Sequence, residues 1–183
     1  MLNGATSNAA LLAVTRKAGW KWAITNQDEW YKAAYHKSDG VTGNYWNYPT
    51  GSNSLPGRNM AEATDPGNNA NYYGQPYPID SSSYYITTVG EFQLSHSPYG
   101  TFDQGGNVWE WNEAVLFDRR GLRGGAFWSS LSADEILCAA NGFASSPSSQ
   151  SSTTGFRVSE VPEPATLTLL ALAGTSLLAR RRR

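Results

Sequence analysis

The chain has 183 residues, of which 40% are hydrophobic, 13% aromatic and only 16% charged, and its formal net charge is −1. This composition excludes a solvated disordered chain, and the near-zero net charge argues against a nucleic-acid partner bound through bulk positive charge. A single cysteine, Cys138, excludes an intramolecular disulfide and any zinc site built from several cysteines.

The first predicted element is a helix over residues 25–36. Two pairs at its start have the spacing of a capping box, Thr25 with Asp28 and Asn26 with Glu29. Apolar side chains then recur at intervals of three and four residues, which places them on one helical face. A Ser-Asp-Gly sequence follows as a stop signal.

Turn-forming residues dominate the next part of the chain, and short strands follow it. Residues 40–80 are dense in Gly, Pro and Asn, which predicts a long looped region held by aromatic side chains. Residues 145–152 are rich in serine and predict an exposed connector. Short strands are predicted at residues 84–89, 107–111, 121–128 and 155–158. The pattern predicts an α+β fold with little regular secondary structure.

Residues 103–110 form the best candidate for a cation site. Asp103 and Glu110 offer the carboxylate oxygens that Ca²⁺ prefers. Between them, Gly106 permits a tight turn, and the carbonyls of Gly106 and Val108 point the same way in an extended segment. The alternative interpretation is a turn that leads into a strand, with no ion.

Other polar residues give weaker signals. Asn71 and the backbone of Tyr72 could meet Asp80 and Ser82 around a second cation, although a solvated loop explains these residues equally well. His36 falls at the helix end, where capping is expected. His96 is expected in solvent, and Cys138 in an apolar, unreactive setting.

Residues 161–183 differ physically from the body of the chain. Prolines precede an uncharged run over residues 165–179, and four arginines close the chain: Arg180, Arg181, Arg182 and Arg183. A helix over this run would be about 22 Å long, short of a hydrocarbon core of about 30 Å, but arginines can snorkel and extend it. We therefore predict a membrane helix with its arginines on the cytoplasmic side. The alternative is a buried core helix with a solvated basic end.

The order of these features resembles the PEP-CTERM sorting signal, in which Pro162, Glu163 and Pro164 are the motif residues. The resemblance implies a cell-envelope protein that an exosortase-type membrane enzyme processes near this motif, with possible release outside the cell. Residues 159–164 are then a linker, and residues 165–183 a transmembrane helix with its arginine cluster. Such sorting requires export, but no N-terminal signal peptide is visible, because basic residues are missing before the short apolar run over residues 9–14.

Six stretches of the body, in the right order, resemble the sulfatase-modifying factor family, which has the fold of the formylglycine-generating enzyme. The most specific are Gly-Asn-Val-Trp-Glu-Trp, Arg-Gly-Gly and Gly-Phe-Arg; the six stretches cover residues 28–35, 45–50, 97–100, 106–111, 122–127 and 155–158. The resemblance implies a C-type-lectin-like topology. It also implies that residues 1–158 are a partial domain whose N-terminal part is missing.

The resemblance places a structural calcium site at Asp103, Gly106, Val108 and Glu110, and the start of a second at Asn71 and Tyr72. Family enzymes oxidise a substrate cysteine with copper held by two cysteines, which lie four and nine residues after the Gly-Gly pair. Those positions here hold Ser129 and Asp134. Copper is not expected, because Cu(I) selects sulfur ligands.

Three hypotheses for function follow. The first is a non-catalytic, calcium-stabilised binding or structural module of the cell envelope, with an extracellular polysaccharide or protein as partner. The second is an oxidoreductase of the formylglycine-generating type that acts on a protein cysteine. The third is a truncated gene product without function. No nucleic-acid partner is expected in any of them.

Overall fold

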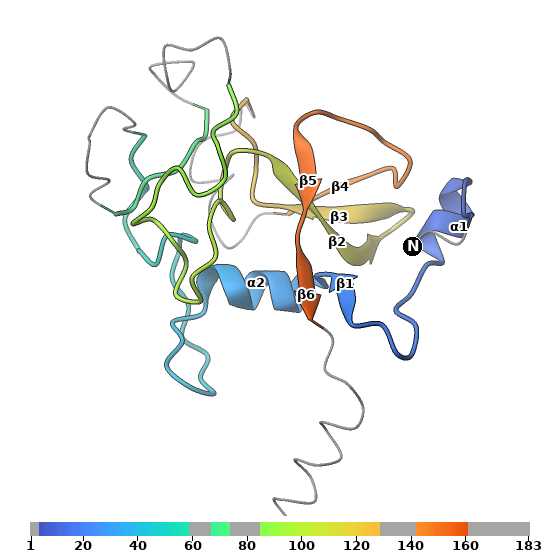
Figure 1. Cartoon of the computed structure of the whole chain (residues 1–183), viewed down its shortest axis with the longest axis horizontal. Helices are drawn as coiled ribbons and strands as arrows, with labels where there is room; N and C mark the ends of the chain where they lie inside the picture. Colours follow the sequence, from blue (N-terminus) through green and yellow to red (C-terminus); the bar gives the residue numbers. More distant parts are fainter. Residues whose placement is uncertain (1–3, 59–66, 74–84, 129–141, 161–183) are drawn as a thin grey trace, which may run out of the picture.

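The computed structural model describes residues 4–58, 67–73, 85–128 and 142–160 (Figure 1). The described residues form two short helices, a four-stranded sheet in the order β4-β3-β2-β5 and a two-stranded ribbon of β1 and β6. The elements are α1 (Asn8–Leu12), β1 (Trp22–Ile24), α2 (Gln27–Tyr35), β2 (Trp109–Leu116), β3 (Arg119–Arg123), β4 (Phe143–Ser145), β5 (Thr154–Phe156) and β6 (Val158–Glu160). The mixed sheet and few helices confirm the predicted α+β fold with little regular structure.

Helix α2 confirms the predicted helix and selects one of the two capping boxes. Asn26 is the N-cap: its side chain accepts a hydrogen bond from the Glu29 N–H, and the Glu29 carboxylate accepts one from the Asn26 N–H. The helix buries Trp30, Ala34 and Tyr35 on one face. Figure 1 shows this helix running alongside the four-stranded sheet, next to the β1–β6 ribbon.

The centre of the sheet is β2, which pairs with β3 in antiparallel and with β5 in parallel fashion. Glu110 on β2 lies opposite Arg123 on one side and Gly155 on the other. The three most specific sequence motifs are therefore neighbours in one sheet.

The predicted strand over residues 155–158 is two strands, β5 and β6, which belong to different sheets. Residue Arg157 separates them, and its side chain turns toward Glu110. Beyond it, β6 pairs with β1, with Val158 opposite Ile24 and Glu160 opposite Trp22.

The strand predicted over 107–111 is β2, which runs from Trp109 to Leu116. Two other strand predictions were wrong, one in extent and one altogether, for identifiable reasons. The strand predicted over 121–128 ends at Arg123, because Gly124 (φ +91°) and Gly125 (φ +75°) take left-handed backbone conformations. Residues 85–89 form no strand, since side chains rather than a ladder hold this segment. The short elements α1, β1 and β4 were not predicted.

Among the described residues, no helix has the length and apolar character needed to cross a membrane. The predicted membrane helix and its arginines lie outside the described residues, as do Pro162, Glu163 and Pro164. The positions Asp80, Ser82, Ser129, Asp134 and Cys138 also lie outside them.

Candidate functional site

Glu110, a predicted calcium ligand, is buried between two other motifs. Its Oε2 accepts a hydrogen bond of 2.6 Å from the indole Nε1 of Trp30 on α2 and one of 2.6 Å from the Nε of Arg157. Glu110 is 5% exposed and Trp30 is fully buried. We call these three residues the motif junction, because each comes from a different sequence motif.

The charges at the junction are unequal. Burial raises the pKa of Glu110, and the nearby Asp103 raises this pKa further. Arg157 lowers the pKa of Glu110 but does not cancel the effect of burial. Burial also raises the pKa of Asp103, although its Oδ2 accepts a hydrogen bond from the Gly90 N–H. Two carboxyl groups therefore face one guanidinium in a partly dehydrated place, where burial disfavours their charged forms.

Gly106 brings the two predicted calcium segments into contact. It has a φ of +81°, and a Cβ built there would lie 2.2 Å from the carbonyl oxygen of Asn71. The same oxygen accepts a hydrogen bond of 2.6 Å from the Asn107 N–H. A glycine is required at this position both for its backbone conformation and for the close approach of the Asn71 backbone.

The next residue, Asn107, holds the segment that was predicted as a strand. Its Oδ1 accepts a hydrogen bond from the Thr87 N–H, and its Nδ2 donates one to the Thr87 carbonyl, both at 3.1 Å. The Asn71 amide donates to the neighbouring Tyr85 carbonyl. Buried amide side chains thus replace a backbone ladder here.

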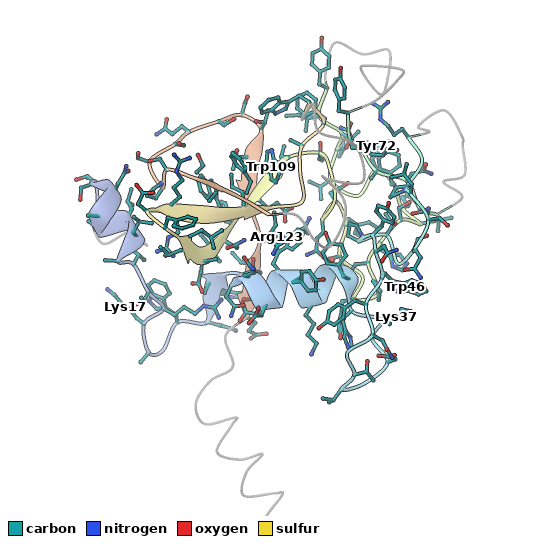
Figure 2. All side chains as sticks on the ribbon, turned by 180° about the vertical axis from the view of Figure 1, so that it is seen from behind. Lys17, Lys37, Trp46, Tyr72, Trp109 and Arg123 are labelled. Carbon is teal, nitrogen blue, oxygen red and sulfur yellow. The ribbon has the colours of Figure 1, made fainter. Side chains whose placement is uncertain are left out.

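The Arg-Gly-Gly motif packs on the other side of the same turn. The Gly124 carbonyl accepts a hydrogen bond from the Gly106 N–H at 2.7 Å. A Cβ on Gly124 would meet the Gln104 carbonyl at 2.8 Å and the Trp30 ring at 3.4 Å. Figure 2 shows Arg123 between the sheet and α2, where its guanidinium lies over the ring of Tyr31.

The residues predicted to bind calcium suit an oxygen-preferring cation. Asp103 and Glu110 are close enough to interact electrostatically, and the Oε1 of Glu110 makes no hydrogen bond within the described part of the chain. There, no group of three or more His, Cys, Asp and Glu side chains comes together. A calcium ion would therefore need backbone carbonyls, such as those of Gly106 and Val108, in addition to the two carboxylates.

Asn71 and Tyr72 are buried, and their groups serve packing. The Tyr72 hydroxyl donates a hydrogen bond of 2.6 Å to the Pro56 carbonyl, and the Asn71 carbonyl is bonded to the turn at Gly106 and Asn107. The structure thus joins this segment to the first predicted calcium site.

His36 is the C-cap of α2, but its ring does not face the helix carbonyls. The Ser38 N–H and the Tyr99 hydroxyl both bond to its Nδ1, and its Nε2 lies 3.1 Å from the Thr42 carbonyl. A backbone N–H can only donate, so Nδ1 is an acceptor and the ring carries its proton on Nε2. His36 therefore holds loops together instead of adding charge to the helix end. His96 is exposed, as expected.

A second set of contacts, which the sequence analysis missed, fastens the N-terminal segment. The Arg16 guanidinium donates to both carboxylate oxygens of Glu29 (2.8 and 2.6 Å) and to Glu113 (2.7 Å). Glu29 also accepts from the Ser159 hydroxyl, and these bonds, led by the one from Arg16, lower its pKa to about 2. Arg120 donates to the carbonyls of Leu11, Leu12 and Val14 at the end of α1. We call the contacts of Arg16 and Arg120 the N-terminal clamp.

Comparison with known proteins assigns the family. The family model of the sulfatase-modifying factor enzyme 1-like domain matches residues 4–161. The chain therefore belongs to this family. Residues 160–183 match the PEP-CTERM protein-sorting motif, which implies sorting to the cell envelope, association with the membrane and exosortase processing.

A solved structure supports the fold. The chain is similar to Treponema denticola variable protein 1, with 23% sequence identity and a TM-score of 0.53 over 86% of this chain and 54% of that one. A second similar structure is CarF, with 21% identity and a TM-score of 0.45 over 77% of this chain and 48% of that one. The chain thus spans about half the length of these two proteins. The search of curated proteins gives no match.

Proposed function

We propose that this chain is a non-catalytic, calcium-stabilised module of the cell envelope, anchored and sorted through its C-terminal signal. The observation that carries the proposal is that one chain joins a sulfatase-modifying factor domain to a PEP-CTERM motif. The domain is the folded part of the chain, and the motif is the signal that directs it to the cell envelope.

The absence of a copper-binding cysteine pair from the sequence supports the non-catalytic role. The positions that match the family's copper ligands hold Ser129 and Asp134, and Cys138 is the only cysteine of the chain. A hydroxyl and a carboxylate are hard ligands and do not suit Cu(I). In addition, the motif residues Trp30 and Arg157 both donate hydrogen bonds to Glu110, and these contacts stabilise the fold.

The oxidoreductase alternative can be tested directly. The purified chain is incubated with Cu(I), oxygen and a cysteine-containing peptide, and the peptide is examined for an aldehyde by mass spectrometry. We expect no aldehyde and no stoichiometric copper in the protein. Peptide oxidation with one bound copper per chain would falsify the non-catalytic role.

Calcium is proposed at Asp103, Gly106, Val108 and Glu110, with Asn71 and Tyr72 supporting the turn. A divalent cation would favour the ionised forms of the two carboxyl groups, which burial disfavours. A cation that binds only to the folded state stabilises it by about 2.7 kcal/mol at 100 times Kd. We expect calcium to raise the melting temperature of the chain and Asp103→Asn to abolish the increase. Asp118→Asn is the matched control, because Asp118 is an exposed carboxylate in the turn between β2 and β3. An equal calcium response in both variants would contradict the site.

Sorting is tested on the full chain placed behind a secretory signal peptide in a host that contains an exosortase. We expect membrane association followed by a loss of mass that corresponds to the tail. Replacing Pro162, Glu163 and Pro164 by alanine is expected to preserve membrane association and abolish the loss of mass. Processing that continues in this variant would contradict exosortase recognition of the motif.

An extracellular polysaccharide or protein is the proposed partner of the body. Tyr45 and Tyr73 are exposed, and the Lys37 Nζ lies 4.2 Å from the ring centroid of Trp46. Exposed aromatic side chains are frequent contacts in binding surfaces. Binding of envelope polysaccharide to the chain, compared with a Tyr45→Ser, Tyr73→Ser variant, tests this part of the proposal; equal binding by both proteins would contradict it.

A further inference from the structure

One face of the β1–β6 ribbon is apolar and exposed. Along β1, Ala23 is buried, whereas Trp22 and Ile24 on either side of it are 56% and 38% exposed. Across the ribbon, Val158 is 53% exposed. Successive side chains of a strand alternate between faces, so the buried and exposed residues belong to opposite faces.

The strand register places the exposed side chains together. Ile24 lies opposite Val158, and Trp22 lies opposite Glu160. The side chains that alternate with them point inward: Arg157 bonds to Glu110 and Ser159 bonds to Glu29. By the same alternation Phe156, which is 63% exposed, continues the apolar face.

The sorting signal begins at the end of this ribbon. Strand β6 ends at Glu160, and the uncharged run of the tail starts at residue 165. The four residues between them span at most about 14 Å. A tail inserted in a bilayer therefore keeps the ribbon next to the membrane surface. Trp22 lies at the level of Glu160. Measured along the strand, Val158 lies about 7 Å farther from the tail than Glu160, and Phe156 lies about 13 Å farther.

The surroundings of the face suit a membrane surface. Tryptophan is enriched at the interface between lipid and water. Two exposed lysines, Lys17 and Lys21, precede β1, and Figure 2 shows Lys17 on the loop that leads into this strand. Glu160 is the single acidic residue within the two strands of the ribbon. With Glu163 of the sorting motif included, the local charge is +2 − 2 = 0, so the apolar side chains carry the attraction and the two lysines add contacts to anionic headgroups.

We propose that the outward face of the β1–β6 ribbon, formed by Trp22, Ile24 and Val158, docks on the surface of an anionic bilayer and holds the domain against the membrane. This inference rests on the membrane anchoring proposed above. It adds that the body itself contacts lipid, in an orientation that β6 fixes.

Depth-dependent quenching tests the proposal on the full chain. A Cys138→Ser background receives one cysteine at a time, as Trp22→Cys, Val158→Cys, Phe156→Cys, Phe117→Cys or Leu170→Cys, and each is labelled with a fluorophore. The proteins are reconstituted in vesicles of phosphatidylethanolamine and phosphatidylglycerol in which part of the lipid is brominated. Phe117, which is fully exposed in the turn between β2 and β3, is the matched control for an apolar surface residue.

We expect brominated lipid to quench the fluorescence at positions 22 and 158 strongly and at position 156, which lies beyond the ribbon, more weakly, with none at 117. Hydrogen exchange of residues 22–24 and 158–160, slower in the vesicles than in detergent, should report the same contact for the unlabelled chain. Position 170 reports tail insertion separately.

The outcomes distinguish this inference from the anchoring on which it rests. Quenching at 170 but not at 22 or 158 leaves the anchor intact and overturns the docking face. No quenching at any position overturns both. A cysteine at 22 or 158 that resists labelling before lipid is added shows that another protein segment covers the face, and this also overturns the proposal.

Discussion

Two groups of charged contacts stabilise this domain, and they differ in burial and in how the sequence marks them. The motif junction pairs Arg157 with a Glu110 side chain that is 7% exposed, whereas in the N-terminal clamp Arg16 meets Glu29 and Glu113 at side-chain exposures of 24–35%. Every residue of the junction lies in a recognisable motif. The donors of the clamp, Arg16 and Arg120, lie outside the recognised motifs.

The difference in how the sequence marks the two groups follows from the free energy that is lost when a charged residue loses its partner. A buried charge that loses its partner costs about 3–5 kcal/mol, so a junction of this kind tolerates few residue types. A pair near the surface contributes less, down to about 0–1 kcal/mol where it is fully exposed, because water can replace either partner. The comparison therefore predicts a series of effects that decrease from the junction to the clamp.

The largest effect is expected for Arg157→Ala. The change leaves the Glu110 carboxylate buried with only Trp30 as its donor, and it should lower the free energy of unfolding by about 3–5 kcal/mol. Urea denaturation at pH 7, followed by tryptophan fluorescence, measures this change.

A double variant separates the loss of the pair from the loss of packing. Arg157→Met combined with Glu110→Gln removes both charges, keeps similar volumes and leaves an amide oxygen that can accept from the Trp30 indole. Replacing a buried pair by uncharged residues of similar volume is often neutral or stabilising. We expect the double variant to recover most of the stability lost by Arg157→Ala. A double variant as unstable as the single one would show that the junction is not held by its charges.

A second large effect is expected at Gly106, which lies beside the junction. Gly106→Ala puts a methyl group 2.2 Å from the Asn71 carbonyl oxygen, while Gly40→Ala, at a φ of +97°, meets nothing within 4 Å. Both variants place an alanine in a left-handed backbone conformation. The difference between their free energies of unfolding therefore measures the steric clash with Asn71, which we expect to cost at least about 2 kcal/mol. Equal melting temperatures for the two alanine variants would contradict this account of the motif glycine.

Sequence reasoning found the parts of the junction but not their assembly. The capping box at Asn26 and Glu29 is local, so the sequence predicted α2 well. The motifs that contain Trp30, Glu110 and Arg157 were each identified, yet their hydrogen bonds span 80 and 47 residues. Those contacts depend on the strand register around Glu110, which no short-range pattern reveals.

The clamp was missed because its donors have no local signature. Arg16 follows an unremarkable stretch, and its partners lie 13 and 97 residues away. The strand prediction at residues 85–87 was wrong for a related reason. The β-forming composition of this segment predicted a strand, but the Asn107 side chain satisfies the Thr87 backbone in place of a neighbouring strand.

A moderate effect is expected from acid, and it belongs to the clamp. The folded-state pKa of Glu29 is about 2, below its ordinary value of 4.5. Its contribution is therefore complete above pH 4.5 and is lost as the pH falls toward 2. Because Glu29 is about one-third exposed, we expect the contribution to be about 1–2 kcal/mol, less than the full shift implies.

Arg16→Met should remove most of this contribution at pH 7 and flatten the decline of stability between pH 4.5 and 2. Lys17→Met is the control, since Lys17 is the adjacent exposed cation. Urea denaturation at several pH values measures both variants. An acid dependence that is identical in Arg16→Met and in the parent would assign the low pKa of Glu29 to its other donors, Asn26 and Ser159.

The smallest effect on global stability is expected at the other donor of the clamp. Arg120 donates to three carbonyls at the end of α1, a helix of five residues that is too short to persist alone. Arg120→Met should therefore release α1 locally: amide exchange at residues 8–14 should accelerate strongly, while the free energy of unfolding falls by only about 0.5–1.5 kcal/mol. Arg119→Met is the control, because within the described residues its one ion pair is with exposed Asp118. If Arg120→Met accelerates exchange throughout the sheet, the clamp belongs to the same cooperative folding unit as the junction. The two regions would then differ in burial but not in their importance for global stability.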